Sequence, residues 1–144
     1  MKLKGRVWKD EKFWLLEVPA FDGMTQGQSR KEALRMMESY VRDALEMPGY
    51  EISVEHHGGD EITLTVSDPK PLVALMVSRT RSASGLTMQE ICDRMGKKGR
   101  NAVRQYETGK HDPSITKLQE LAAAMGFDVQ LDLVPRQKLK KKAG

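Results

Sequence analysis

The sequence predicts an α+β protein in which a small sheet-and-helix unit precedes an all-helical unit. Apolar residues alternate with polar ones in short runs over the first 67 residues, and they recur at helical spacing from Leu72 onward. The stretch Asp68-Pro69-Lys70-Pro71 separates the two patterns. The length of 144 residues suits one or two small domains. We therefore expect domains at residues 1–67 and 72–135, a linker at 68–71, and a basic tail at 136–144 that is predicted to be disordered.

The first unit is expected to be a sheet with one helix packed across it. Its predicted strands occupy residues 2–9, 12–18, 50–55 and 61–67. Residues 21–27 are a predicted loop, followed by a short third strand. Ser29 can cap the helix, with Glu32 three residues later as its reciprocal partner, and Pro48-Gly49 ends it. One face of this helix is apolar at spacings of three and four residues: Ala33, Leu34, Met37, Tyr40, Val41, Ala44 and Leu45.

The second unit is expected to hold four helices. The first helix is indicated by the apolar residues Leu72, Leu75 and Met76, and the second runs from Thr87 to Gly96. The third has Ala102, Val103 and Tyr106 on its apolar side and ends near Gly109, and the fourth runs from Ser114 to Gly126. A threonine or serine hydroxyl caps a helix start, and a glycine commonly follows a helix end. The second and third helices, with the turn at Gly96 between them, have the layout of a helix-turn-helix motif.

Residues 127–134 are predicted to form a short C-terminal strand. Phe127, Val129, Leu131 and Leu133 alternate with polar residues. A lone strand at a domain edge leaves its backbone groups free to pair with another chain. The pattern therefore predicts a homodimer through the second unit.

Charge divides unevenly between the two halves. Residues 1–68 hold 9 lysines and arginines against 13 aspartates and glutamates, a balance of −4, whereas residues 69–144 hold 15 against 7, a balance of +8. Such asymmetry favours nucleic acid as the partner of the second half and a basic partner for the first. The alternative is a pair of solvated surfaces whose charges differ by chance.

The third helix of the second unit is the candidate DNA-reading element. Its predicted base-contacting residues are Arg100, Asn101, Arg104 and Gln105, because arginine pairs with guanine edges and asparagine or glutamine with adenine edges. Its predicted phosphate contacts are Lys97, Lys98, Lys110 and, from the bracing helix, Gln89. Six cations face a single anion, Glu107, between Arg94 and Lys110. A helical bundle that is basic by chance is the less favoured interpretation.

The sequence argues against catalysis and against a resident metal or cofactor. The carboxylates of the first unit are spread over turns, a strand and the whole circumference of a helix, so no set converges as metal-dependent phosphodiester cleavage requires. His56, His57 and Asp60 are not expected to hold a metal, because adjacent side chains in a strand point to opposite faces, and a tight hairpin tip is the favoured interpretation. The single cysteine, Cys92, excludes an internal disulfide and is expected to be buried. No membrane segment is expected, and the default location is cytoplasmic.

The first unit is also a candidate protein-binding surface. Its aromatic residues are Trp8, Phe13, Trp14 and Phe21. Aromatic side chains on an uncovered face of a sheet serve as interface anchors. The alternative is that they fill the core, which is favoured for Trp14 and evenly balanced for Trp8 and Phe13. Together with the carboxylates of Glu17 and Asp22, these four residues are the expected partner-binding set.

These features together resemble the HicB antitoxins of bacterial toxin–antitoxin systems. Residues 13–19 (Phe-Trp-Leu-Leu-Glu-Val-Pro), residues 23–27 (Gly-Met-Thr-Gln-Gly) and Glu32-Ala33-Leu34 look like the N-terminal domain of that family. The second unit resembles the Xre/Cro-type helix-turn-helix found in one of its branches. The resemblance implies a reduced RNase H-like fold for residues 1–67, without nuclease activity.

The resemblance also implies a function. The N-terminal domain would bind a small basic mRNA-cleaving toxin of the HicA type and mask its active-site histidine. The C-terminal domain would dimerise and bind operator DNA to repress its own operon. Two alternatives remain: a repressor whose N-terminal domain senses a small molecule, and an RNase H-like nuclease directed by a DNA-binding tail.

Overall fold

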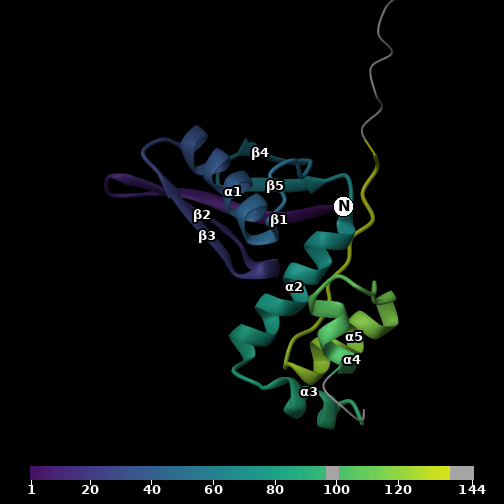
Figure 1. The fold of residues 1–144 in the computed structure, drawn as a ribbon. Coiled ribbons are helices and arrows are strands. Elements are labelled where there is room, and N and C mark those ends of the chain that lie inside the picture. The colour runs from purple at the N-terminus through teal and green to yellow at the C-terminus, as the bar shows by residue number, and fades with distance from the viewer. Residues whose placement is uncertain (97–100, 137–144) are drawn as a thin grey trace, which may run out of the picture.

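In the described residues, five strands form one antiparallel sheet with helix α1 across one face, and four further helices follow (Figure 1). The computed structural model describes residues 1–96 and 101–136. The elements are β1 (Lys2–Asp10), β2 (Phe13–Val18), the 3-10 turn η1 (Pro19–Phe21), β3 (Gly23–Gly27), α1 (Arg30–Leu45), β4 (Ile52–Gly58), β5 (Glu61–Val66), α2 (Pro69–Ser84), α3 (Met88–Arg94), α4 (Asn101–Glu107) and α5 (Ile115–Ala124). The α+β class is confirmed.

The sheet has the strand order β3-β2-β1-β5-β4, so the first strand lies at its centre. Val7 of β1 is opposite Leu16 of β2, and Leu3 is opposite Leu64 of β5. Because side chains alternate between the two faces of a strand, these registers place the apolar residues of three strands on one side. This inner face packs against α1 and forms the core of the first unit. The opposite, outer face carries no buried side chain.

Helix α1 begins where the sequence predicts, although its cap differs in detail. The hydroxyl of Ser29 accepts a hydrogen bond from the backbone N–H of Glu32 at 3.1 Å. The Glu32 carboxylate accepts instead from the N–H of Gln28, at 3.0 Å, one residue before the cap. Both contacts satisfy backbone donors near the helix start. The helix buries Ala33, Met37 and Val41 against the sheet.

A glycine allows the start of α1 to approach the edge strand β3 closely. Gly27 is the last residue of β3, and a Cβ atom there would lie only 2.6 Å from the backbone nitrogen of Ala33. Any side chain would therefore push the helix away from the sheet. The strand also begins earlier than predicted: Gly23 to Gly27 are all paired with β2, so most of the predicted loop at 21–27 is strand.

Helix α2 contributes to the core of the first unit and also contacts α4 and α5 of the second. It begins at Pro69, within the stretch 68–71 expected to be a linker, because the Asp68 carboxylate accepts from the N–H of Lys70 at 3.1 Å and caps the helix. Leu72 and Leu75 are buried in the core of the sheet. Farther along, the guanidinium of Arg79 lies 5.7 Å from the ring centre of Tyr40 on α1. The division into domains remains a prediction.

Tyr50 ties the start of α2 to the sheet. Its side chain is 5% exposed, and its hydroxyl donates to the backbone oxygen of Asp68 at 2.6 Å. Burial, reinforced by the negative charge of Asp68, raises the pKa of Tyr50 to about 12. The residue that caps α2 is thus held by a side chain from the segment before β4.

The predicted strand at residues 127–134 is wrong for this structure. No residue from 127 to 136 belongs to a strand or helix. A strand exists only where its backbone groups pair with a neighbour, and within the described chain no strand pairs with this segment. It passes the sheet instead: the Val129 N–H donates to Gln119 at 3.2 Å, and Asp132 lies 3.4 Å from Lys4 in an exposed ion pair. Residues 137–144, most of the predicted tail, lie outside the described residues.

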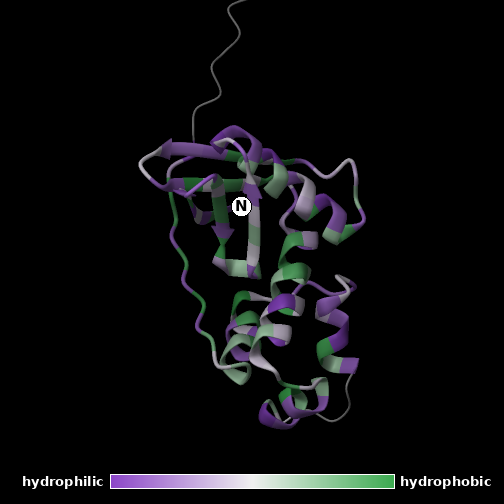
Figure 2. Ribbon diagram, turned by 90° about the vertical axis from the view of Figure 1, so that its left-hand side faces the viewer, coloured by the Kyte–Doolittle hydropathy of each residue, from purple (hydrophilic) through white to green (hydrophobic). Residues whose placement is uncertain are grey.

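The segment exposes its apolar side chains. Phe127 is 45% exposed, Leu131 is 63% exposed and Val134 is 59% exposed, and Leu133 is fully exposed. Figure 2 shows hydrophobic and hydrophilic residues alternating along it. The alternation that predicted a strand is therefore present, without a partner strand.

The remaining helices have a core of their own. Its buried residues are Ile91, Cys92, Val103, Leu121, Ala124 and Met125. Cys92 is buried, as predicted. In the described part of the chain, no helix is both long enough and apolar enough to span a membrane.

Candidate nucleic-acid interface

Helix α3 is built as a short, well-capped brace. The Thr87 hydroxyl accepts from the N–H of Glu90 at 3.1 Å, and Ile91 and Cys92 are buried beneath the helix. The chain leaves the helix through Gly96, whose φ of 65° is in the left-handed region that glycine adopts without strain. The cap and the glycine thus delimit a helix of seven residues.

Helix α4 presents a polar face opposite its single buried residue. Val103 is 1% exposed and packs into the helical core, with Tyr106 partly buried beside it. Asn101 and Arg104 are exposed, and Gln105 is half-buried. This places the predicted base-contacting side chains of α4 away from the core, as an element that enters the major groove requires.

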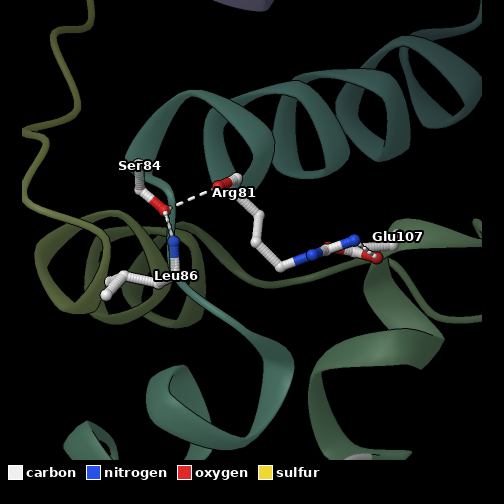
Figure 3. Close-up of polar contacts among 4 residues, drawn as sticks. All are labelled: Arg81, Ser84, Leu86 and Glu107. Atoms are coloured by element: carbon white, nitrogen blue, oxygen red, sulfur yellow. Dashed lines mark hydrogen bonds and ion pairs between the residues drawn. The ribbon is translucent and has the colours of Figure 1, made fainter.

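An ion pair between α2 and α4 fixes the far end of the candidate reading helix. Glu107 ends α4, and its carboxylate accepts from both Nε and Nη2 of Arg81, the second bond at 3.3 Å. The Glu107 side chain is 8% exposed and that of Arg81 26%. Figure 3 shows the two side chains end to end, with Ser84 bridging the oxygen of Arg81 to the N–H of Leu86. Such two-pronged pairs restrain geometry as well as contributing energy.

Two polar side chains on α3 have internal partners. The Gln89 amide, predicted to contact phosphate, donates to Asp93 at 2.8 Å along the same helix. Arg94, one of the six cations of the motif, donates to the backbone oxygen of Ala124 at 3.0 Å and so braces the end of α5. Arg94 therefore serves the packing of the unit in this structure.

The remaining predicted DNA contacts divide between the described and the undescribed parts of the chain. Lys110 follows α4 and is exposed, on the same stretch as the exposed Arg104. Lys97, Lys98 and Arg100 lie outside the described residues. The assignment of individual contacts remains a prediction.

Arg81 and Glu107 are not among the functional residues that the sequence predicts. One signal was present: Glu107 is the single anion among six cations between Arg94 and Lys110. A lone carboxylate in such a stretch indicates an internal partner, because it would otherwise repel a phosphate backbone. The sequence does not indicate which arginine that partner is.

The structure separates the predicted partner-binding residues. Trp8, Phe13 and Glu17 lie on the outer face of the sheet, where Glu17 pairs with Arg6 at 2.6 Å. Trp14 faces inward beneath Arg30, and Phe21 is fully buried, stacked at 6.3 Å on Tyr40. A fully buried Phe21 has no surface to offer a partner.

Asp22 is exposed at the corner between η1 and β3, with a φ of 52°. In the described residues, no group of three or more histidine, cysteine or carboxylate side chains is arranged to hold a metal ion. His56 and His57 bond instead to the Gly59 carbonyl and the Thr63 hydroxyl.

Comparison with known families agrees with the geometry of the second unit. Residues 78–131, from the second half of α2 into the C-terminal segment, match a helix-turn-helix family model. The search of curated proteins found no match to this chain. This part of the chain therefore resembles an Xre/Cro-type helix-turn-helix, and the match indicates sequence-specific DNA binding and a role in transcription regulation.

Proposed function

We propose that this protein is a non-enzymatic antitoxin and autorepressor. Its C-terminal unit binds operator DNA, and its N-terminal unit binds and neutralises a small basic ribonuclease toxin of the HicA type. The observation that carries the DNA-binding half is α4, which buries Val103 and exposes Asn101 and Arg104 within the segment that matches the helix-turn-helix family. Arginine and asparagine have the donor and acceptor geometry to read guanine and adenine edges.

Two observations support the antitoxin half. The resemblance of residues 13–19 and 23–27 to HicB antitoxins covers β2 and β3, which form one end of the sheet. The N-terminal half carries a net charge of −4, which complements a basic toxin. Binding there would neutralise the toxin by covering its active site.

The exposed C-terminal segment supports a homodimer. Leu131, Leu133 and Val134 are each more than half exposed on a segment that alternates apolar and polar residues. A second copy could supply the missing strand, so that two segments pair across a two-fold axis and bury these side chains. Two recognition helices related in this way match a palindromic operator.

The deciding experiment is co-expression with the short reading frame next to this gene. If the neighbour arrests growth alone, and this protein restores growth and co-purifies with it on one tagged chain, the antitoxin function stands. A neighbour that is harmless, or toxic but neither bound nor rescued, removes the antitoxin function and leaves a DNA-binding regulator.

One observation favours a ligand-responsive repressor as the second candidate. An open cleft of about 450 Å³ lies between the end of α1, the first half of α2 and the residues that follow α4. Its walls include Leu45, Met47, Pro71, Ala74 and Thr108. A ligand there would touch both units at once. Narrowing the cleft with Ala74→Leu should remove the response of operator binding to metabolites in cell extract if this candidate is correct.

A further inference from the structure

Among the described residues, no side chain on the outer face of the sheet is buried, and this face carries one apolar patch. The patch consists of Trp8, Phe13, Leu15 and Met24, contributed by three adjacent strands. Leu15 is at its centre: it is opposite Trp8 of β1 and Gln26 of β3, and Phe13 precedes it by two residues on the same face. Met24 is 52% exposed and Phe13 is 43% exposed.

Polar contacts order the border of this patch. The guanidinium of Arg6 lies 4.4 Å from the ring centre of Trp8, and its Nε donates to Glu17 at 2.6 Å. Glu17 is itself opposite Met24 on β3. The ion pair with Glu17 restrains Arg6, and Arg6 in turn restrains the indole ring of Trp8. The Trp8 side chain therefore loses little conformational entropy when a partner binds. An aromatic anchor with a polar border is the usual composition of a protein-binding hot spot.

The charges of the outer face select the class of partner. Its cations are Lys2, Lys4 and Arg6, and its carboxylates are Asp10, Glu17, Glu55 and Glu61. Three cations against four carboxylates do not form the positive surface that a phosphate backbone requires. The aromatic residues on this face are therefore suited to protein and not to nucleic acid.

The described part of the C-terminal segment leaves the patch open. The C-terminal segment reaches this face at Lys4, through the ion pair with Asp132. Lys4 and Trp8 are four residues apart on the same strand, which corresponds to roughly 13 Å. The segment thus contacts the opposite end of β1.

We propose that the patch of Trp8, Phe13, Leu15 and Met24 is the docking surface for a basic protein partner, with the net negative charge of the first unit guiding the approach. This inference rests on the proposed function, since the toxin is the basic partner in question. It places the toxin on the outer face of β1, β2 and β3, on the side of the sheet opposite α1.

The test is affinity for the toxin with its active-site histidine replaced, so that the complex can be prepared without killing the host. Phe13→Glu and Met24→Glu each place a carboxylate in the patch, on side chains exposed enough for the fold to tolerate it. Met36→Glu is the matched control: Met36 lies on α1 and is 45% exposed, similar to Met24. Thermal unfolding and operator binding of all three variants verify that the fold is intact.

We expect each patch variant to weaken toxin binding at least tenfold, with the control within about twofold of the parent chain. If the patch variants bind the toxin as tightly as the parent chain, or if only Met36→Glu loses affinity, the proposed docking surface is wrong while the antitoxin function stands. If the parent chain does not bind the toxin, the proposed function fails and this surface with it. If the patch variants change self-association of the protein alone, as measured by sedimentation, the patch is a contact between copies and the proposal is overturned.

Discussion

Arg104 provides the most direct test of base reading. Its side chain is exposed on α4 while its neighbour Val103 is buried, so removing it changes the surface and leaves the core intact. A well-placed arginine contact to a base contributes about 1–3 kcal/mol of discrimination. We therefore expect Arg104→Ala to weaken operator binding about tenfold or more, measured by fluorescence anisotropy on DNA from the protein's own promoter.

The control for Arg104→Ala is partner binding. The substitution is far from the sheet in the chain and should leave toxin co-purification unchanged. If partner binding is lost from a variant that is still folded, the assignment of two functions to two units is wrong.

Tyr50 predicts a pH dependence of stability. Its pKa is raised from 10.0 to about 12 in the folded protein, first by burial and then by the charge of Asp68. A raised pKa means that its contribution to the free energy of unfolding is complete below about pH 10 and is lost as pH rises toward 12.

Tyr50→Phe separates this contribution from that of the other groups that titrate at high pH. The variant should lose about 1 kcal/mol at neutral pH, because the hydrogen bond to the Asp68 oxygen is removed. Between pH 10 and 12, denaturation should show a steeper loss of stability for the parent chain than for the variant. Parallel curves would contradict the raised pKa.

At the scale of elements, the position of α4 depends on its contact with α2. Removing one partner of a mostly buried ion pair leaves the other charge unsatisfied, at a cost of about 3 kcal/mol where burial is high. Glu107→Gln should therefore lower the free energy of unfolding by somewhat less, about 2 kcal/mol, because Arg81 is still 26% exposed.

Chemical denaturation measures the loss of stability. The affinity of the folded variant for operator DNA then shows whether α4 is still correctly positioned. Lys117→Gln is a useful control, since its partner Glu120 is 50% exposed where Glu107 is 8% exposed, and a pair that is open to solvent contributes little. Equal stability of Glu107→Gln and the parent chain would mean that the pair does not fix α4.

The C-terminal segment predicts concentration-dependent association. If Leu131, Leu133 and Val134 are buried against a second copy, Leu133→Lys places a charge within that contact. Sedimentation should then show a shift from dimer to monomer, together with weaker binding to a palindromic operator. A parent chain that is monomeric at micromolar concentration would contradict a dimer formed by this segment.

Most of the correctly predicted elements are indicated by signals that lie within a few residues of one another, such as helix caps. Ser29 before Glu32 and Thr87 before Glu90 start helices where the structure has them, because capping depends only on residues close in sequence. The strand at 127–134 could not be decided in this way, since a strand depends on a partner that the sequence pattern does not contain. The burial of Phe21 could not be predicted from local sequence either, because it depends on packing against α1.

At the scale of the whole molecule, the least predictable feature is the way in which the units share α2. Asp68-Pro69-Lys70-Pro71 has the composition of a linker, yet proline is favoured in the first turn of a helix and Asp68 is a good cap. The strand order with β1 at the centre was likewise not predicted, because it depends on pairing between residues up to 63 positions apart, such as Lys2 with Thr65.

The shared helix has a consequence for dividing the protein. A fragment that ends at residue 68 would lack Leu72 and Leu75, and would expose the part of the sheet core that they cover. We expect residues 1–68 to be markedly less stable than residues 1–84, as circular dichroism melting of the two purified fragments would show. Equal melting temperatures would mean that α2 adds nothing to the sheet. Exchange of DNA-binding modules between related genes would accordingly have to preserve the first half of α2, so that a viable recombination point lies within this helix and not at the proline-rich stretch before it.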